Sequence, residues 1–158
     1  MSKFAKIIYS GSYLPESILT NKDLESIVDT TDEWIIERTG IKERRVSSDD
    51  ETSVDMAFQA SIDAIDKSGI KKDEIGAIFL ATCTPERKFP STAVLLQNRL
   101  NIKNAFSVDL NAACTGFVYA LDIAKKYIES EEVKYALVVG TEKITSLLDW
   151  TDRNTCVL

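Results

Sequence analysis

The sequence of 158 residues predicts an α/β domain in which a mostly parallel, mixed sheet carries helices on both faces. Two continuous apolar runs, residues 75–81 and 133–140, have the length and composition of strands buried on both faces, as in parallel sheets. Segments with helical periodicity lie between and beside them, so strands and helices alternate along the chain. Alternation of this kind favours right-handed crossovers between neighbouring parallel strands.

The first thirty residues predict two short elements. Residues 6–9 form an apolar run that we expect to be a first strand. Residues 21–28 have the composition of a short helix, and Asn21 is a residue type that commonly caps a helix N-terminus.

A second short helix is expected over residues 31–39. Thr30 and Glu33 have the spacing of a capping box, in which a side-chain oxygen accepts a hydrogen bond from the first helical turn. Gly40 suits the left-handed residue that commonly ends a helix. The sequence therefore predicts both ends of this helix.

Two longer helices follow. Thr52 and Asp55 have capping-box spacing, and apolar residues then recur at helical intervals up to Gly69. The opposite side of this helix is polar, so it should cover an outer face of the sheet. Residues 91–100 predict another helix, with Asn101 as its stop.

The segment around Cys114 combines a strand with the start of a helix. Residues 106–110 alternate apolar and polar side chains, and an apolar helical run begins directly after Cys114. A thiol near a helix N-terminus loses its proton more easily, since the unpaired N–H groups favour negative charge. The small residues around Cys114 would let a thioester approach the sulfur. The alternative is a small buried side chain at a junction.

The helix after Cys114 is expected to be buried all round. Residues 117–124 contain hardly any polar side chain, and one sheet face covers only one side of a helix. Another chain, or sequence beyond this one, would have to cover the second side. After it, residues 141–150 read as a loop with some helix, and residues 155–158 as the start of a strand.

Composition excludes several functional classes. The net charge of −6 argues against nucleic acid as a partner, and no apolar run approaches the about 18 residues of a membrane span. The three cysteines lie far apart and histidine is absent, so neither a metal site nor a disulfide framework is expected. We therefore expect a cytoplasmic protein without a membrane partner. Lys42, Arg44 and Arg45 form the densest basic cluster, which is either a patch for an acidic carrier protein or a solvated turn.

Trp34 and Arg38 are four residues apart and should share one helix face. An indole beside a guanidinium makes a flat cationic platform on which a purine can stack. The alternative, which the spacing also fits, is that Trp34 and Arg38 only pack against each other on the helix surface.

The segment Asn111–Phe117, with Cys114 inside it, resembles the nucleophile segment of the β-ketoacyl-acyl-carrier-protein synthase III family. Other segments resemble that family in the same order along the whole chain. They are residues 11–15, 32–41, 89–91, 135–140 and 151–153.

The resemblance implies a thiolase-like fold, in which two α/β halves stack as five αβαβα layers. Residues 1–158 would form the N-terminal half-domain, and the C-terminal half would be absent from this sequence. It also implies roles for seven residues: Cys114 as nucleophile, Thr30, Trp34, Arg38 and Arg153 as coenzyme A contacts, and Phe89 and Ile144 as lining of the acyl pocket. Without the resemblance, Phe89 would be interpreted as a loop anchor.

The activity implied is acylation of Cys114 from acetyl-CoA or another short acyl-CoA, then condensation with malonyl-acyl carrier protein. Coenzyme A thioesters would be substrates rather than resident cofactors, and the enzyme would be a homodimer. The histidine and asparagine that the family uses for decarboxylation belong to its second half, so residues 1–158 alone should not condense. The alternatives are another thiolase-superfamily acyltransferase and a non-catalytic interaction domain.

Overall fold

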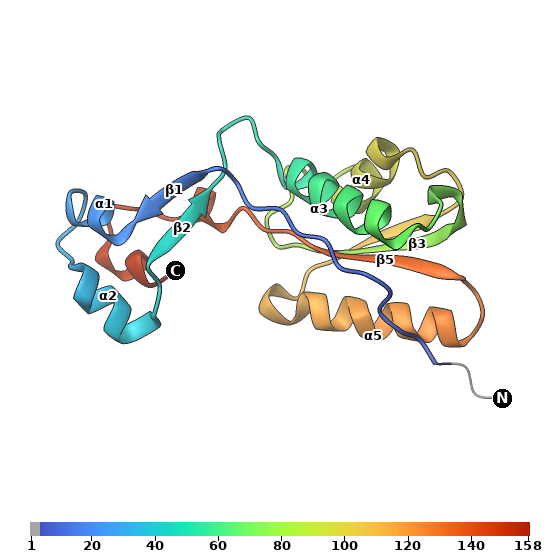
Figure 1. Cartoon of the computed structure of the whole chain (residues 1–158). Coiled ribbons are helices and arrows are strands. Elements are labelled where there is room, and N and C mark those ends of the chain that lie inside the picture. The colour runs from blue at the N-terminus through green and yellow to red at the C-terminus, as the bar shows by residue number, and fades with distance from the viewer. Residues whose placement is uncertain (1–3) are drawn as a thin grey trace. The chain divides into compact units, whose positions relative to one another are not determined.

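The computed structural model describes residues 4–158, which form two compact units (Figure 1). Unit 1 contains residues 4–13 together with Thr52–Glu142. Unit 2 contains Leu14–Glu51 together with Lys143–Leu158. Each unit therefore joins segments that are far apart in the sequence.

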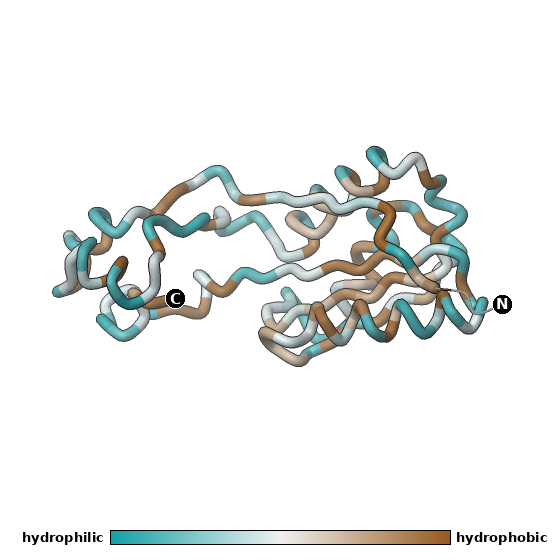
Figure 2. Tube along the Cα trace, turned by 60° about the horizontal axis from the view of Figure 1, so that its bottom comes forward, coloured by the Kyte–Doolittle hydropathy of each residue, from teal (hydrophilic) through white to brown (hydrophobic). Residues whose placement is uncertain are grey.

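Unit 1 is built on a parallel sheet with the strand order β4-β3-β5. The strands are β3 (Ile75–Ala81), β4 (Phe106–Leu110) and β5 (Tyr135–Gly140). The predicted parallel pairing of the run at 75–81 and its burial on both faces are confirmed. Hydrophobic residues are concentrated along these strands (Figure 2).

Helices cover both faces of this sheet. One face carries α3 (Ser53–Ser68) and α4 (Thr92–Leu100), and the other carries α5 (Gly116–Glu129), as Figure 1 shows. Short 3₁₀ turns precede β3 and α5; they are η1 (Lys72–Glu74) and η2 (Ala113–Thr115). The alternation of strands and helices expected from the sequence is therefore present.

Strand β3 supplies side chains to two hydrophobic clusters, one on the α3 and α4 face of the sheet and one on the α5 face. Ile78 and Leu80 pack in a cluster with α3 and α4, whereas Ala77 and Phe79 pack against α5. Period-two alternation of a strand explains this division. Ile75 breaks the alternation because the pairing with β5 shifts register between Ile75 and Ala77, so Ile75 joins the α3 and α4 side.

Local capping signals predict α3 and α4 correctly. The Thr52 and Asp55 side chains form the expected capping box, and α3 ends at Gly69 with φ of 69°. Asn101, at φ of 56°, ends α4. The N-terminus of α4 is held from β4, because the Asp109 carboxylate accepts hydrogen bonds from the first two helical N–H groups at 2.8 and 2.7 Å.

Within residues 4–158 helix α5 is covered on one side only, as expected for a helix packed on a single sheet. Among the described residues only Gly116, Ala120 and Ala124 are buried on it, and Val118 is 61% exposed. Phe117 and Tyr119 are exposed as well. The physical reason is that the sheet covers one side of the helix, and the first turns are apolar on both sides. The cover that the sequence calls for is not provided by residues 4–158.

Unit 2 contains an antiparallel pair of short strands with helices packed beside it. Its elements are β1 (Ser17–Thr20), α1 (Asn21–Glu25), α2 (Asp32–Thr39), β2 (Glu43–Val46), η3 (Ile144–Leu147) and η4 (Arg153–Val157). Its core contains Leu24, Ile35 and Cys156, with Trp34 and Trp150 packed against them. The carboxyl-terminal segment is therefore an integral part of this unit.

Four boundary predictions in the terminal regions are wrong. Residues 6–9 are not a strand, and residues 155–157 belong to the 3₁₀ turn η4, since an apolar run becomes a strand only beside another strand that pairs with it. Thr20 rather than Asn21 caps α1, and Thr31 rather than Thr30 caps α2. In both helices a hydroxyl one residue away takes the capping position. Gly40 ends α2 as predicted, with φ of 72°.

No helix within residues 4–158 has both the length and the apolar composition to span a bilayer.

The ion pair between Asp55 on α3 and Arg99 on α4 predicts how the stability of the protein depends on acid pH. Partial burial opposes ionisation of Asp55, but hydrogen bonds from Thr52 and Arg99 outweigh it and lower the pKa of Asp55 to about 2. Arg99 also lies over the Phe58 ring at 4.6 Å. A carboxyl with a lowered folded-state pKa stabilises the protein above its unfolded pKa of about 3.9, and loses that effect as pH falls toward 2.

We therefore expect Asp55→Asn to lower the free energy of unfolding of the full-length protein by about 1–2 kcal/mol at pH 7. The difference from wild type should shrink between pH 4 and about 2, measured by urea unfolding. Asp66→Asn, on an exposed position of the same helix, is the matched control and should change little. A pH-independent difference for Asp55→Asn would contradict the expectation.

Candidate active site

Cys114 lies where β4 passes into α5. It is exposed, and it occupies the middle of η2, two residues before α5 begins. The turn is held by Thr115, whose N–H and hydroxyl both donate to the Ala112 carbonyl, at 3.2 and 2.8 Å. Ala113 has φ of 45°, in the left-handed region. The sulfur is therefore on a short, tightly folded segment with open access.

Glycines bring the start of α5 close to the strand ends. A Cβ on Gly116 would lie 3.1 Å from the Ala81 Cβ at the end of β3, and a Cβ on Gly140 would lie 3.1 Å from the Phe117 ring. Contacts this short are tighter than most Cβ contacts, so a side chain at either position would require its neighbour to shift by a few tenths of an ångström. The close approach places Cys114 at the carboxyl edge of the sheet, where open α/β sheets bind their ligands.

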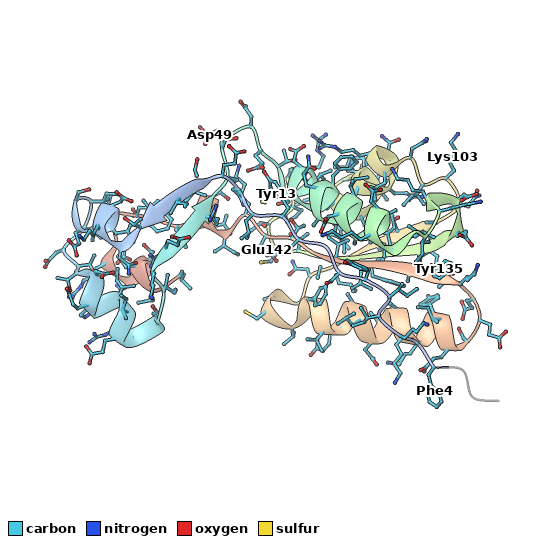
Figure 3. All side chains as sticks on the ribbon, viewed as in Figure 1. Phe4, Tyr13, Asp49, Lys103, Tyr135 and Glu142 are labelled. Atoms are coloured by element: carbon cyan, nitrogen blue, oxygen red, sulfur yellow. The ribbon has the colours of Figure 1, made fainter. Side chains whose placement is uncertain are left out.

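A carboxylate fastens the turn that follows β3 at the same edge. Glu142, labelled in Figure 3 just after β5, accepts hydrogen bonds from the Cys83 N–H at 2.9 Å and the Thr84 hydroxyl at 2.7 Å. Burial, together with the hydrogen bond and charge of Glu142, raises the pKa of the Cys83 thiol, and the charge of Cys114 adds to this effect. Glu142 is not among the predicted site residues; the signal for it is a carboxylate two residues after the buried strand β5.

The remaining predicted residues of unit 1 differ in accessibility. Phe89 is 88% exposed on the loop before α4, so it lines no enclosed space formed by the described residues of that unit. Cys83 is half-buried, as expected for a residue that closes the end of a strand.

Three predicted residues come together in unit 2. The Arg38 guanidinium carbon lies 4.3 Å from the centre of the Trp34 ring, and that of Arg153 lies 4.4 Å from it. Arg38 comes from the next turn of α2, while Arg153 comes from η4, over a hundred residues later. The structure thus builds a cationic aromatic cluster, which we call the Trp34 platform (Trp34, Arg38 and Arg153).

Thr30 and Ile144 also belong to unit 2. The Thr30 hydroxyl is buried and has no hydrogen-bond partner among residues 4–158. Ile144 begins η3 and is partly exposed. A buried hydroxyl without a partner is costly, and a bound molecule can satisfy it.

The basic cluster at residues 42–45 is not a uniform surface patch. Arg44 is buried on β2 and donates to the Asn21 side chain and to main-chain carbonyls of the carboxyl-terminal segment. Arg45 donates to the Pro15 carbonyl and lies 3.6 Å from the Glu43 carboxylate. For Arg44 both alternatives, a carrier patch and a solvated turn, are wrong, because its side chain is buried while β pairing turns its neighbour Arg45 to the opposite face.

Among the described residues, no group of three or more histidine, cysteine, aspartate or glutamate side chains is arranged to hold a metal ion. The chemistry available at Cys114 is nucleophilic: an accessible sulfur, small neighbours and main-chain N–H groups of a helix start.

Known proteins match this chain along its whole length. The 3-oxoacyl-[acyl-carrier-protein (ACP)] synthase III family profile matches residues 108–158. A β-ketoacyl-[acyl-carrier-protein] synthase III from Xanthomonas oryzae is 52% identical over 160 residues, which cover 100% of this chain and 49% of the relative. The chain thus spans about half the length of the curated relatives it matches.

Solved structures agree in fold. The crystal structure of 3-oxoacyl-[acyl-carrier-protein] synthase III from Aquifex aeolicus superposes with a TM-score of 0.93 at 52% identity, covering 97% of this chain and 49% of that one. The priming β-ketosynthase of the R1128 polyketide pathway gives a TM-score of 0.94 at 35% identity, covering 99% and 47%. The predicted fold class, one half of a thiolase-like α/β architecture, is confirmed.

The differing exposure of the three thiols predicts different alkylation rates. In the full-length protein, iodoacetamide should modify Cys114 at least tenfold faster than Cys83, whose pKa is raised, and faster still than Cys156, which is fully buried. Peptide mapping after short exposure measures the three rates separately. Equal rates at Cys114 and Cys83 would contradict the assignment of Cys114 as the reactive thiol.

Proposed function

Because this chain belongs to the β-ketoacyl-acyl-carrier-protein synthase III family and represents its N-terminal half, we propose that the whole protein is a condensing acyltransferase. It takes an acetyl or other short acyl group from coenzyme A and joins it to malonyl-acyl carrier protein. The product, a 3-oxoacyl-acyl carrier protein, begins fatty acid synthesis. The observation that carries this proposal is the exposed Cys114 at the junction of β4 and α5.

The first step is an exchange of thioesters. The Cys114 thiolate attacks the carbonyl carbon of the acyl-CoA, the new C–S bond forms, and coenzyme A leaves as its thiolate. Main-chain N–H groups of the turn before α5 are available to the oxyanion of the tetrahedral intermediate. The second step releases carbon dioxide from the malonyl group, and the resulting carbanion attacks the acyl carbon and frees the Cys114 sulfur.

Decarboxylation needs hydrogen-bond donors that this sequence does not supply as histidine, because residues 1–158 contain none. In the family these donors are a histidine and an asparagine of the second half. Residues 1–158 would therefore carry the nucleophile, and the second half would carry the decarboxylation donors.

The Trp34 platform is proposed as the binding site for the coenzyme A adenine. An electron-rich indole flanked by two guanidinium groups favours a purine, and the same cations attract its phosphates. The buried Thr30 hydroxyl, which has no partner among the described residues, supports a ligand contact in the same unit. Coenzyme A is accordingly a substrate carrier and not a resident cofactor.

We also propose a cytoplasmic homodimer in which Phe89 of one copy closes the acyl pocket of the other. The exposure of Phe89 supports this, since an 88% exposed phenylalanine has apolar surface left to bury. Ile144 is proposed to line the acyl pocket. The three cysteines are free, which fits a reducing compartment.

Acylation of Cys114 is directly measurable. Full-length protein incubated with acetyl-CoA should gain the mass of one acetyl group, located on the Cys114 peptide, and Cys114→Ala should gain none. Cys83→Ala is the control and should be acetylated like the wild type, because Cys83 has no assigned role in the reaction. An acetyl group found on another residue of the wild type would refute the proposed function.

Removing the indole tests the adenine site. Trp34→Ala in the full-length protein should raise KM for acetyl-CoA about fivefold to tenfold and leave kcat nearly unchanged, the loss expected for a stacking contact of about 1 kcal/mol. Ile36→Ala, on the exposed side of the same helix, is the control. An unchanged KM for Trp34→Ala would place the adenine elsewhere.

A further inference from the structure

Arg44 is a buried cation of unit 2 whose recorded partners are uncharged. It is 7% exposed on β2. Its Nη1 donates to the Asn21 Oδ1 at 2.5 Å, its Nε donates to the Leu158 carbonyl at 3.1 Å, and its Nη2 donates to the Cys156 carbonyl. Burying a guanidinium is costly, so each of its hydrogen bonds is expected to matter for the local structure.

The Asn21 amide extends these contacts to α2. Its Nδ2 donates at 2.7 Å both to the Asp32 carboxylate and to the Ile41 carbonyl. Asp32 is the first residue of α2, the helix that carries Trp34 and Arg38. A continuous set of hydrogen bonds therefore joins the start of α2, through Asn21 and Arg44, to the carboxyl-terminal turn η4.

Arg153, the third member of the Trp34 platform, lies on that turn. Its guanidinium carbon is 4.4 Å from the indole centre, and a purine stacked between two flat groups needs about 7 Å. The Arg153 side chain must therefore move away from the indole to admit the ring. The part of the site that can stay in place is the main chain of η4, because Arg44 donates to its Cys156 carbonyl and to the Leu158 carbonyl directly after it.

We propose that Arg44 is a positioning residue for the Trp34 platform: by binding η4 and, through Asn21, α2, it sets the separation at which Arg153 and Trp34 accept a purine. This inference rests on the proposed function, because it assumes that the platform binds the coenzyme A adenine. Arg44 itself contacts neither the substrate nor the reacting atoms.

Arginine is required for this role. Its planar group presents several donors in fixed directions, and three of them reach separate acceptors on two segments. A lysine keeps the charge but places one ammonium group on a flexible stem, so it does not reproduce the three fixed directions in which Arg44 donates to the Cys156 carbonyl, the Leu158 carbonyl and the Asn21 oxygen. Arg44→Lys therefore keeps the positive charge and removes the fixed arrangement of hydrogen-bond donors.

The experiment compares two substrates of the full-length protein, acetyl-CoA and acetyl-pantetheine, which lacks the adenosine together with the diphosphate and the 3′-phosphate. For Arg44→Lys we expect the ratio of kcat/KM values, acetyl-CoA over acetyl-pantetheine, to fall about tenfold. The values for acetyl-pantetheine should stay within about twofold of wild type, because Cys114 and its turn are untouched. General loss of structure would instead lower the kcat/KM values of both substrates together and leave their ratio unchanged.

Arg45→Lys is the matched control, since Arg45 is the exposed neighbour on the same strand. It should leave the substrate ratio unchanged. Retention of the wild-type ratio by Arg44→Lys would overturn the inference.

Two further outcomes are decisive. A wild-type protein that does not prefer acetyl-CoA over acetyl-pantetheine would refute the proposed adenine site itself, and with it the role of Arg44. Should Arg44→Lys fail to fold by circular dichroism, Asn21→Ser removes the other end of the same connection. A fallen ratio in Asn21→Ser supports the inference, and an unchanged ratio overturns it.

Discussion

The close packing of α5 against the ends of the strands is the constraint on which unit 1 depends. At Gly116 there is little room for a side chain, since a Cβ would lie 3.1 Å from the Ala81 Cβ at the end of β3. This contact lets α5 begin directly at the sheet edge. The two residues before it, Cys114 and Thr115, remain exposed to solvent. An exposed sulfur at a fixed position is the result, held by main-chain geometry rather than by side-chain partners.

The same edge collects polar groups because parallel strands end together there. Asp109 turns from β4 toward the N-terminus of α4, and Glu142 reaches from beyond β5 to the turn after β3. Both carboxylates satisfy N–H groups that would otherwise be unpaired at a helix start or a tight turn. The edge is therefore rigid around an accessible thiol, which suits a nucleophile that must meet an incoming thioester.

Unit 2 is held together by a small apolar core and by the hydrogen bonds of a buried arginine. Its apolar core is small, and the buried Arg44 adds hydrogen bonds between segments separated by more than a hundred residues. The Trp34 platform depends on this arrangement, because α2 contributes two of its members and η4 contributes the third. A pair predicted from helix spacing thus becomes a three-membered site only through a long-range contact.

Sequence reasoning succeeded where the controlling interaction is local. The Thr52 and Asp55 capping box, the left-handed Gly40, Gly69 and Asn101, and the apolar run of β3 each act within a few residues, so the sequence by itself determined these helix ends and the central strand. The tertiary structure alone decided the burial of Arg44, the role of Glu142 and the absence of a strand at residues 6–9. The physical reason is that burial and strand pairing depend on which segments, distant in the sequence, pack against a residue in the folded protein. A local sequence pattern does not contain that information.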